Sequence, residues 1–244
     1  MFFLIATLLT LPPRHIPPEQ IQAFTLEGQI PVSYWYFNNT YSAVQPLVYT
    51  YEAIETMKSR VLAREVNHYG STDPFLYAAL DQFPIRGKKV AIMGSIIPWY
   101  EAMVLAYGGK PTTIDYNRIV SEHPDVRTLT VEEYEKNPEM FDAVISISSY
   151  EHDGLGRYGD PIAPRGDFMA MEKTKKMLVP RGLLFLAVPI GKDHLVWNAH
   201  RVYGAIRLPL LLAGWKRIAS FGFEESDLQR EGSEQPVFVL QVDE

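Results

Sequence analysis

The sequence contains no cysteine among its 244 residues. This absence excludes a disulfide scaffold, a thiolate nucleophile, an iron–sulfur cluster and a cysteine-ligated zinc site. The sequence also lacks a dense run of lysine and arginine, and its net charge is −6. Such a chain offers little to a phosphate backbone, so we do not expect nucleic acid as a partner.

No apolar run is long enough to cross a bilayer, which requires about 20 residues. The N-terminal run covers residues 1–11 and is broken by Pro12 and Pro13. It has no preceding basic residue and no clear small-residue cleavage site, which favours the cytoplasm over the secretory pathway. Residues 1–11 are either a signal or membrane anchor, or a strand or buried arm packed on the domain. They are the one segment that could tether the chain to a membrane.

The residues that are present indicate a folded protein, because 47% are hydrophobic and 12% aromatic. A chain of this size and composition can bury a substantial core. Residues 1–48 are rich in proline and aromatic side chains without a sustained period, and we interpret them as an irregular N-terminal arm. Residues 49–244 are interpreted as a single domain, in which short apolar runs alternate with helical patterns.

This alternation predicts an α/β fold with a mostly parallel, Rossmann-like sheet and helices on both faces. The expected parallel strands lie near 90–93, 112–115, 126–130, 143–147 and 183–188. The expected helices begin near 49, 73, 98, 131 and 168. Two further strands, near 215–223 and 236–242, are separated by a polar segment too short for a crossover helix. They complete a seven-stranded sheet as a C-terminal antiparallel hairpin.

Ligands of such sheets bind at the carboxyl ends of the parallel strands. Gly94 and Ser95 follow the first expected strand and precede a helix, where a glycine allows close approach and free amides attract an anionic group. Asp115 ends the second strand, where a carboxylate can accept both hydroxyls of a ribose. These residues predict nucleoside binding. The structural alternative is a tight turn with an aspartate that caps a helix.

The densest polar stretch is the loop after the strand that ends at 147. It contains four acids, two arginines, four glycines and one histidine between Ser148 and Asp167. A loop of this length without periodicity is usually functional or disordered, and its mixed charges favour order. We interpret His152 as a general base that Glu151 orients or assists. Alternatively, the role is only structural, and the loop conformation is stabilised by Glu151, Arg157 and Asp160.

A second polar group follows the strand at 183–188. His200 and Arg201 are expected to face a substrate, or to pair with the acids of the loop. Together with His152 and Asp153 this region offers nitrogen and oxygen ligands, but it has no metal-binding spacing, and we predict no metal site. The isolated His15, His68 and His123 are interpreted as surface residues.

Several of these segments resemble class I S-adenosylmethionine-dependent methyltransferases. Residues 177–189 are similar to the "L-K-P-G-G" turn and fifth strand of that superfamily, and 141–146 followed by Glu151-His152 to its fourth strand with the "E-H" that often follows. Residues 149–161 and 197–204 closely resemble the family called domain of unknown function 268. The resemblance implies a methyltransferase-like domain over residues 49–244 and S-adenosylmethionine as cofactor.

The resemblance also assigns roles by position. Gly94 and Ser95 would line the methionine end of the cofactor, Asp115 would bind its ribose, and Ser148 and Ser149 would lie beside the methyl group. The acceptor would be a small molecule that is polar or bears a hydroxyl group. The expected substrate-binding residues are Asp153, Arg157, Tyr158, Asp160, His200 and Arg201.

The sequence departs from the superfamily pattern in its first loop. The glycine-rich G-x-G-x-G is reduced to Gly94-Ser-Ile-Ile-Pro98, and Ile92 replaces the usual acid two residues before the glycine. Fewer glycines leave less room for a cofactor, so a catalytically inactive binding or scaffold protein is the main alternative. A nicotinamide-dependent oxidoreductase is a weaker one, because G-x-G-x-x-G is missing and the expected C-terminal hairpin is atypical of dehydrogenases.

Overall fold

The computed structural model describes residues 11–39 and 45–242. Its α-helices are α1 (Ile21–Phe24), α2 (Tyr51–Leu62), α3 (Thr72–Gln82), α4 (Trp99–Ala106), α5 (Val131–Lys136), α6 (Gly166–Met177) and α7 (Arg207–Leu211). Short 3₁₀ turns lie at Pro18–Gln20, Tyr150–His152 and Glu225–Gln229. Its strands are β1 (Val32–Tyr34), β2 (Leu47–Tyr49), β3 (Lys89–Met93), β4 (Lys110–Asp115), β5 (Ile119–Ser121), β6 (Arg127–Thr130), β7 (Phe141–Ile147), β8 (Leu178–Ala187), β9 (His194–Trp197), β10 (His200–Val202), β11 (Trp215–Phe221) and β12 (Val237–Val242).

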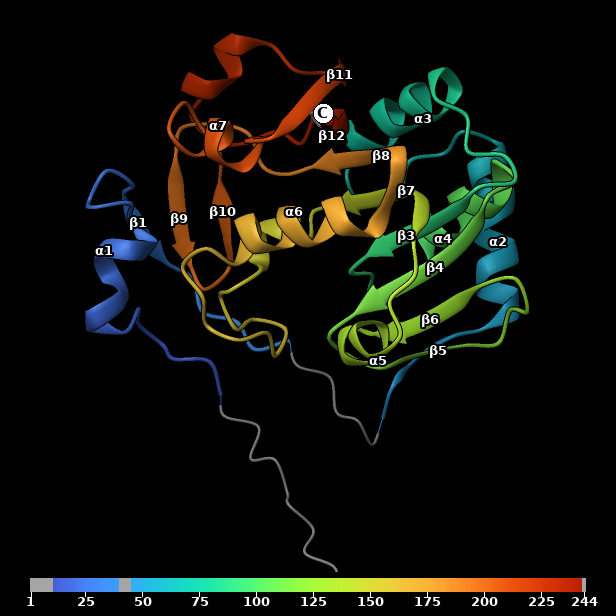
Figure 1. Cartoon of the computed structure of the whole chain (residues 1–244), viewed down its shortest axis with the longest axis horizontal. Helices are drawn as coiled ribbons and strands as arrows, with labels where there is room; N and C mark the ends of the chain where they lie inside the picture. The colour runs from blue at the N-terminus through green and yellow to red at the C-terminus, as the bar shows by residue number, and fades with distance from the viewer. Residues whose placement is uncertain (1–10, 40–44, 243–244) are drawn as a thin grey trace, which may run out of the picture.

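The central feature is a seven-stranded sheet in the order β11-β12-β8-β7-β3-β4-β6 (Figure 1). The strands from β8 to β6 run parallel to their neighbours, whereas β12 is antiparallel to both β8 and β11. This arrangement confirms the predicted mostly parallel sheet with a C-terminal antiparallel hairpin.

Both faces of this sheet are covered because alternate side chains of a strand point in opposite directions. Val90 and Ile92 of β3 join the apolar cluster formed with α2, α3 and α4. Ala91, between them, joins the cluster formed with α6 and α7. All three residues are at most 1% exposed, and burying a side chain the size of valine or isoleucine contributes about 1.5–3 kcal/mol.

A smaller sheet of β1, β9 and β10 lies beside α6 and joins the N-terminal residues to the domain (Figure 1). β1 runs parallel to β9, with Val32 opposite Leu195. Phe24 and Trp197 meet edge to face at 5.0 Å in the core of this region. Residues 12–48 were expected to be irregular, but the described part contains a short helix and two short strands. Their three or four residues are too few for a sequence period.

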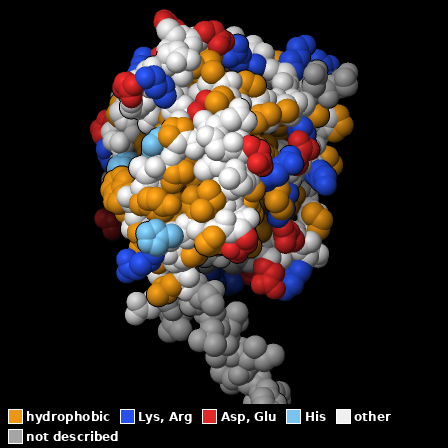
Figure 2. All heavy atoms as spheres, turned by 90° about the vertical axis from the view of Figure 1, so that its left-hand side faces the viewer, with side chains coloured by type: hydrophobic (Ala, Val, Ile, Leu, Met, Phe, Trp, Pro, Cys, Tyr) orange, Lys and Arg blue, Asp and Glu red, His pale blue; other side chains and the backbone are white. Residues whose placement is uncertain are grey.

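The N-terminal region also exposes apolar side chains. Figure 2 views the molecule from the side of α1 and β1 and shows apolar side chains at its surface. The exposed ones in this region include Leu11, Ile21, Tyr34 and Trp35. The expectations for residues 1–11 lie outside the described residues, apart from Leu11. Within the described ranges, no helix has the length and apolar character needed to span a membrane.

One expectation about histidine is wrong. His123 was interpreted as a surface residue, but only 6% of it is exposed. Its ring stacks on Tyr51 at 4.9 Å, and its Nε2 atom lies 3.1 Å from a carboxylate oxygen of Glu55. The sequence separates these partners by about 70 residues, so no local pattern could indicate the contact.

Candidate active site

A cavity of about 560 Å³ opens at the carboxyl ends of β3, β4 and β7. This volume is within the range of small-molecule sites. The cavity brings together every expected site residue except Arg201. Those that line it are Gly94, Ser95, Asp115, Ser148, Ser149, Glu151, His152, Asp153, Arg157, Tyr158, Asp160 and His200.

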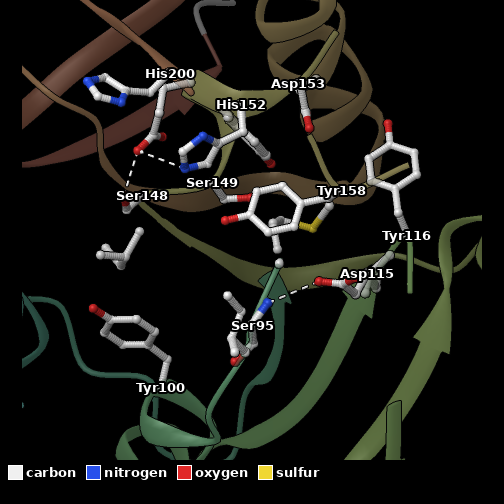
Figure 3. A pocket seen from close by; sticks show the side chains of 18 of the residues that line it. Ser95, Tyr100, Asp115, Tyr116, Ser148, Ser149, His152, Asp153, Tyr158 and His200 are labelled. Atoms are coloured by element: carbon white, nitrogen blue, oxygen red, sulfur yellow. Dashed lines mark hydrogen bonds and ion pairs between the residues drawn. The ribbon is translucent and has the colours of Figure 1, made fainter. Parts of the chain in front are cut away.

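The turn after β3 and the end of β4 form one side of the cavity. The backbone amide of Ser95 donates to Asp115 Oδ2 at 3.2 Å, and the amide of Asn117 donates to Oδ1 at 2.6 Å. Figure 3 shows the bond between Ser95 and Asp115, with Ser148, Ser149 and His152 on the opposite side. Burial raises the pKa of Asp115 despite these two bonds. The Asp115 carboxylate is thus held in a fixed orientation at the tip of its strand.

Gly94 has a φ of +69° and faces the cavity. A Cβ atom at this position would lie 2.7 Å from Ser149 Oγ and 3.9 Å from Asp115 Oδ2. The bare backbone therefore keeps open a space between the ends of β3, β4 and β7. Ile96, which stands where the superfamily pattern has its second glycine, and its neighbour Ile97 are exposed and lie on the lining without closing it.

The first helical turn of α4 places a carboxyl group directly behind this turn. Glu101 is fully buried and accepts hydrogen bonds from Thr113 Oγ1 at 2.6 Å and from Ser95 Oγ at 3.2 Å. Burial raises the pKa of Glu101 to about 7. Glu101 thereby connects the turn after β3 with the end of β4. No sequence pattern indicates this role, because one acid in an apolar helix is not distinctive.

The opposite side of the cavity begins at the end of β7. Ser148 has a φ of +50°, a left-handed conformation that is uncommon for residues other than glycine and clusters at functional sites. Its hydroxyl donates to Glu151 Oε1 at 2.6 Å. Burial raises the pKa of Glu151 to about 7, although Ser148 and the charge of Arg157 act in the opposite direction.

His152 is held in one tautomer. Its Nδ1 atom lies 2.6 Å from the carbonyl oxygen of Ala199 and must donate, which leaves a lone pair on Nε2. That Nε2 atom lies 3.7 Å from Glu151 Oε1. Burial and the positive charge of Arg157 lower the pKa of His152 to about 3. His152 is therefore neutral at physiological pH and presents a hydrogen-bond acceptor.

Asp153 and Asp160, two of the three aspartates in the loop, differ in what they bind. Asp160 accepts hydrogen bonds from the backbone amides of Gly154, Gly156 and Tyr158 and fixes the turns of the loop. The carboxyl group of Asp153 makes no hydrogen bond to the described residues. Burial, together with the nearby charge of Asp160, raises the pKa of Asp153 well above its usual range.

Arg157 and His200 complete this side of the cavity. The guanidinium of Arg157 donates to Asn39 Oδ1 at 2.8 Å and to the Ala199 carbonyl at 3.1 Å, and it lies over the ring of Tyr158. Arg157 thus joins the N-terminal region to the loop. Burial and the charge of Arg157 lower the pKa of His200.

Arg201 does not line the cavity, and its expected contact with substrate is not supported. Its side chain is 1% exposed and donates to the backbone carbonyls of Glu151 at 3.2 Å and Asp153 at 2.7 Å. It also lies 3.8 Å from the carboxylate of Asp167. Arg201 therefore supports the loop from behind. This agrees with the second role expected for it, which was to pair with the acids of the loop.

Several lining residues were missed by the sequence reasoning. They come from the segment between α2 and α3, from α4 and from the approach to β12, and they include His68, Tyr69, Tyr100, Ser233 and Gln235. His68 is exposed, as expected for a surface residue, but it lines this cavity. None of these positions stands at the end of a parallel strand, so the topological rule could not find them. Within the described ranges, no group of three or more histidine, aspartate or glutamate side chains could hold a metal ion.

The sequence matches one known protein family. A family model described as "Caenorhabditis protein of unknown function, DUF268" matches residues 87–235, which is more than half of the chain. The chain belongs to the DUF268 family. The match extends from β3 to the residues just before β12 and thus includes most of the cavity lining. Comparison with curated proteins gives no match.

Solved structures show what fold this DUF268 chain has. A 1,6-didemethyltoxoflavin-N1-methyltransferase of Burkholderia thailandensis, solved with bound 1,6-didemethyltoxoflavin and S-adenosylhomocysteine, is 18% identical at a TM-score of 0.54, covering 82% of this chain and 93% of that one. The CcbJ methyltransferase of Streptomyces caelestis is 11% identical at a TM-score of 0.46, with coverages of 70% and 90%. The N-methyltransferase NodS of Bradyrhizobium japonicum is 14% identical at 0.44, with coverages of 70% and 93%.

Of these three similarities, the one to the Burkholderia enzyme is close enough to support a conclusion about fold. This DUF268 chain has a class I methyltransferase fold, which confirms the expectation drawn from residues 141–146 and 177–189. At 18% identity the similarity concerns the fold alone, because one fold hosts many chemistries.

Proposed function

We propose that the protein is an S-adenosylmethionine-dependent methyltransferase with a small acceptor that is polar or bears a hydroxyl group. One observation carries this proposal: a single cavity joins the Gly94–Ser95 turn and Asp115 to the titratable group of Ser148, Glu151 and His152. The first side has the geometry to hold a nucleoside, and the second can accept a proton. The Burkholderia methyltransferase of the same fold, solved with S-adenosylhomocysteine, is consistent with this division.

The residues of the first side fit the cofactor. Gly94 leaves space for the ligand, and the Asp115 carboxylate retains lone pairs for two ribose hydroxyls after binding the amides of Ser95 and Asn117. The single glycine of this turn motivated the alternative of an inactive scaffold. The open volume of about 560 Å³ argues against an occluded cleft. When bound, S-adenosylmethionine supplies an electrophilic methyl group on a positively charged sulfur.

The residues of the second side can handle the acceptor proton. A general base works best when its pKa lies near the working pH. Glu151, whose pKa is about 7, meets this condition better than His152, whose pKa is about 3. We therefore assign the base role to Glu151 and give His152 the role of a neutral hydrogen-bond acceptor. Positioning supplies much of the remaining rate enhancement, because methyl transfer requires alignment of the acceptor with the methyl group.

The test is calorimetric titration of the purified protein with S-adenosylmethionine, S-adenosylhomocysteine and NAD. We expect the two adenosyl ligands to bind in the micromolar range and NAD to bind more weakly. Asp115→Asn should weaken their binding about 10- to 150-fold, because it removes hydrogen bonds to a charged group. Asp125→Asn is the matched control, since Asp125 is exposed and lies outside the cavity lining.

Each other outcome has a definite meaning. Equal losses in Asp115→Asn and Asp125→Asn would contradict the proposed ribose contact. Stronger binding of NAD than of the adenosyl ligands would favour the oxidoreductase. Binding of none of the three ligands to the folded protein would favour the scaffold alternative.

A further inference from the structure

Gln235, Ser148 and Glu151 form a chain of hydrogen bonds in the cavity, and the donor of each bond can be assigned. When Glu151 is ionised, the form in which it acts as a base, its carboxylate can only accept, so the Ser148 hydroxyl donates its proton to Oε1 at 2.6 Å. Ser148 Oγ must then use a lone pair toward Gln235, whose Nε2 lies 3.2 Å away. Gln235 therefore directs its amide nitrogen at Ser148 and keeps its amide oxygen for another partner.

Two buried oxygen atoms at the ends of this chain have no hydrogen-bond partner among the residues that the structure describes. They are Glu151 Oε2 and Gln235 Oε1, and both residues line the cavity. The side chain of Glu151 is only 1% exposed, so bulk water reaches it poorly. Buried polar atoms of native proteins are nearly always hydrogen-bonded, and exceptions often mark a functional site. These two oxygens therefore indicate a place for a ligand.

The third polar atom of this group is also an acceptor. His152 Nε2 carries a lone pair because Nδ1 donates to the Ala199 carbonyl. In Figure 3, Ser148 and His152 lie on the same side of the cavity and His200 lies close to them. A ligand that satisfies Glu151 Oε2, Gln235 Oε1 and His152 Nε2 must supply hydrogen-bond donors.

The nearby charges restrict this ligand further. An anionic group would face the three acceptor atoms Glu151 Oε2, Gln235 Oε1 and His152 Nε2. A cationic group would be repelled by the guanidinium of Arg157, whose positive charge is close enough to affect the pKa values of Glu151 and His152. A neutral compound with two or more hydroxyl groups meets neither difficulty.

We propose that the methyl acceptor is a neutral polyhydroxyl compound and that adjacent hydroxyls of this acceptor donate to Glu151 and Gln235. The inference rests on the proposed methyltransferase function and specifies its substrate class. Gln235 becomes a specificity-determining residue, although it belongs to the C-terminal hairpin and not to a parallel strand end. Glu151 holds the hydroxyl from which it also removes the proton.

The test uses full-length protein loaded with S-adenosylhomocysteine, after the affinity for that ligand has been measured by calorimetry. Catechol and myo-inositol are the probes with adjacent hydroxyls. 1,2-Dimethoxybenzene has the shape of catechol without its donors, and benzoate is the anionic comparison. Binding of each probe at millimolar concentration is measured by saturation-transfer NMR, with displacement by catechol to show that the probes share a site.

We expect the two diols to bind and the diether and benzoate to bind more weakly. Gln235→Leu should weaken diol binding about three- to tenfold, which is the effect of removing one neutral hydrogen bond. It should leave the affinity for S-adenosylhomocysteine unchanged, which also shows that the variant is folded. Gln241→Leu is the matched control, because Gln241 lies farther along β12 and donates to the carbonyl of Arg181 instead.

The outcomes separate the two proposals. If S-adenosylhomocysteine binds but neither diol does, or if diol and diether bind equally, the polyhydroxyl acceptor is wrong and the methyltransferase proposal stands. Preferred binding of benzoate would have the same meaning, as would equal diol affinity in Gln235→Leu and the wild type. If S-adenosylhomocysteine does not bind to the folded protein, the proposed function fails and this inference fails with it.

Discussion

The two ends of the segment 148–167 have similar residue types but opposite environments. At the anchored end, Arg207 binds both oxygens of Asp167, at 2.9 and 2.8 Å, and Tyr203 donates to the same carboxylate at 3.0 Å. At the cavity end, Glu151 keeps one buried oxygen without a partner, and Asp153 makes no hydrogen bond to the described residues.

The pKa values follow the same division. Burial alone would raise the pKa of Asp167, but the charges of Arg201 and Arg207 outweigh it and lower that pKa. For Glu151 the burial effect prevails, and its pKa rises to about 7. A buried carboxylate with a bidentate arginine is part of the architecture. When a buried carboxyl group has no arginine partner, burial destabilises its ionised form and raises its pKa. Such a group can then accept or release a proton near neutral pH.

The largest expected effect comes from breaking the anchored end. Arg207→Met would leave the Asp167 carboxylate buried without its bidentate partner, and breaking a buried pair in this way costs about 3–5 kcal/mol. Denaturant unfolding at neutral pH measures the loss. Arg118→Met is the control, because the ion pair of Arg118 with Glu133 is exposed and should contribute little. Equal stability of both variants would contradict the role of the anchor.

The cavity end should show the reverse behaviour. Glu151→Gln should lower the methyl-transfer rate about 10²- to 10⁴-fold, the usual contribution of a general base. The wild-type kcat/KM should rise with pH through about 7, as Glu151 loses its proton, and the variant should lack this rise. Turnover is followed as release of S-adenosylhomocysteine. An unchanged pH profile in the variant would remove Glu151 from the base role.

The stability of the same variant sharpens the contrast. The pKa of Glu151 is higher in the folded than in the unfolded protein, so its contribution to the free energy of unfolding falls as pH rises from about 4.5 to about 7. Glu151→Gln removes this contribution and should be at least as stable as the wild type at pH 8. A loss of stability as large as that of Arg207→Met would mean that both ends of the segment are structural.

The smallest expected effect concerns the turn on the other side of the cavity. Gly94→Ala should cost about 1–2 kcal/mol because the φ of +69° is unfavourable for alanine, and it should weaken S-adenosylhomocysteine binding. Gly28→Ala is the control, since Gly28 has a φ of +80° with no atom within 4 Å of an added Cβ. Gly94→Ala combined with Ser149→Ala removes the 2.7 Å contact and should restore part of the affinity. No restoration would mean that the backbone conformation alone governs binding.

Local patterns were sufficient for the main sheet. β3, β7 and β8 are short apolar runs next to turn residues, and their burial on both faces produces that signal. The same logic located Gly94, Asp115 and Ser148, because the carboxyl ends of parallel strands meet at one edge. Arg201 could not be assigned in this way, since its direction depends on the small sheet of β1, β9 and β10.

The sequence by itself determined the order of the main elements, the antiparallel ending and the strand ends that line the cavity. These features follow from residue periodicity and from the rules of parallel sheets. Only the tertiary structure decided which polar residues face the cavity and which are anchored. Asp167 is bound by Arg207, 40 residues away, whereas Glu151 accepts from Ser148, whose hydroxyl in turn accepts from Gln235, 87 residues away. Contacts across such separations depend on packing, which no local sequence pattern records.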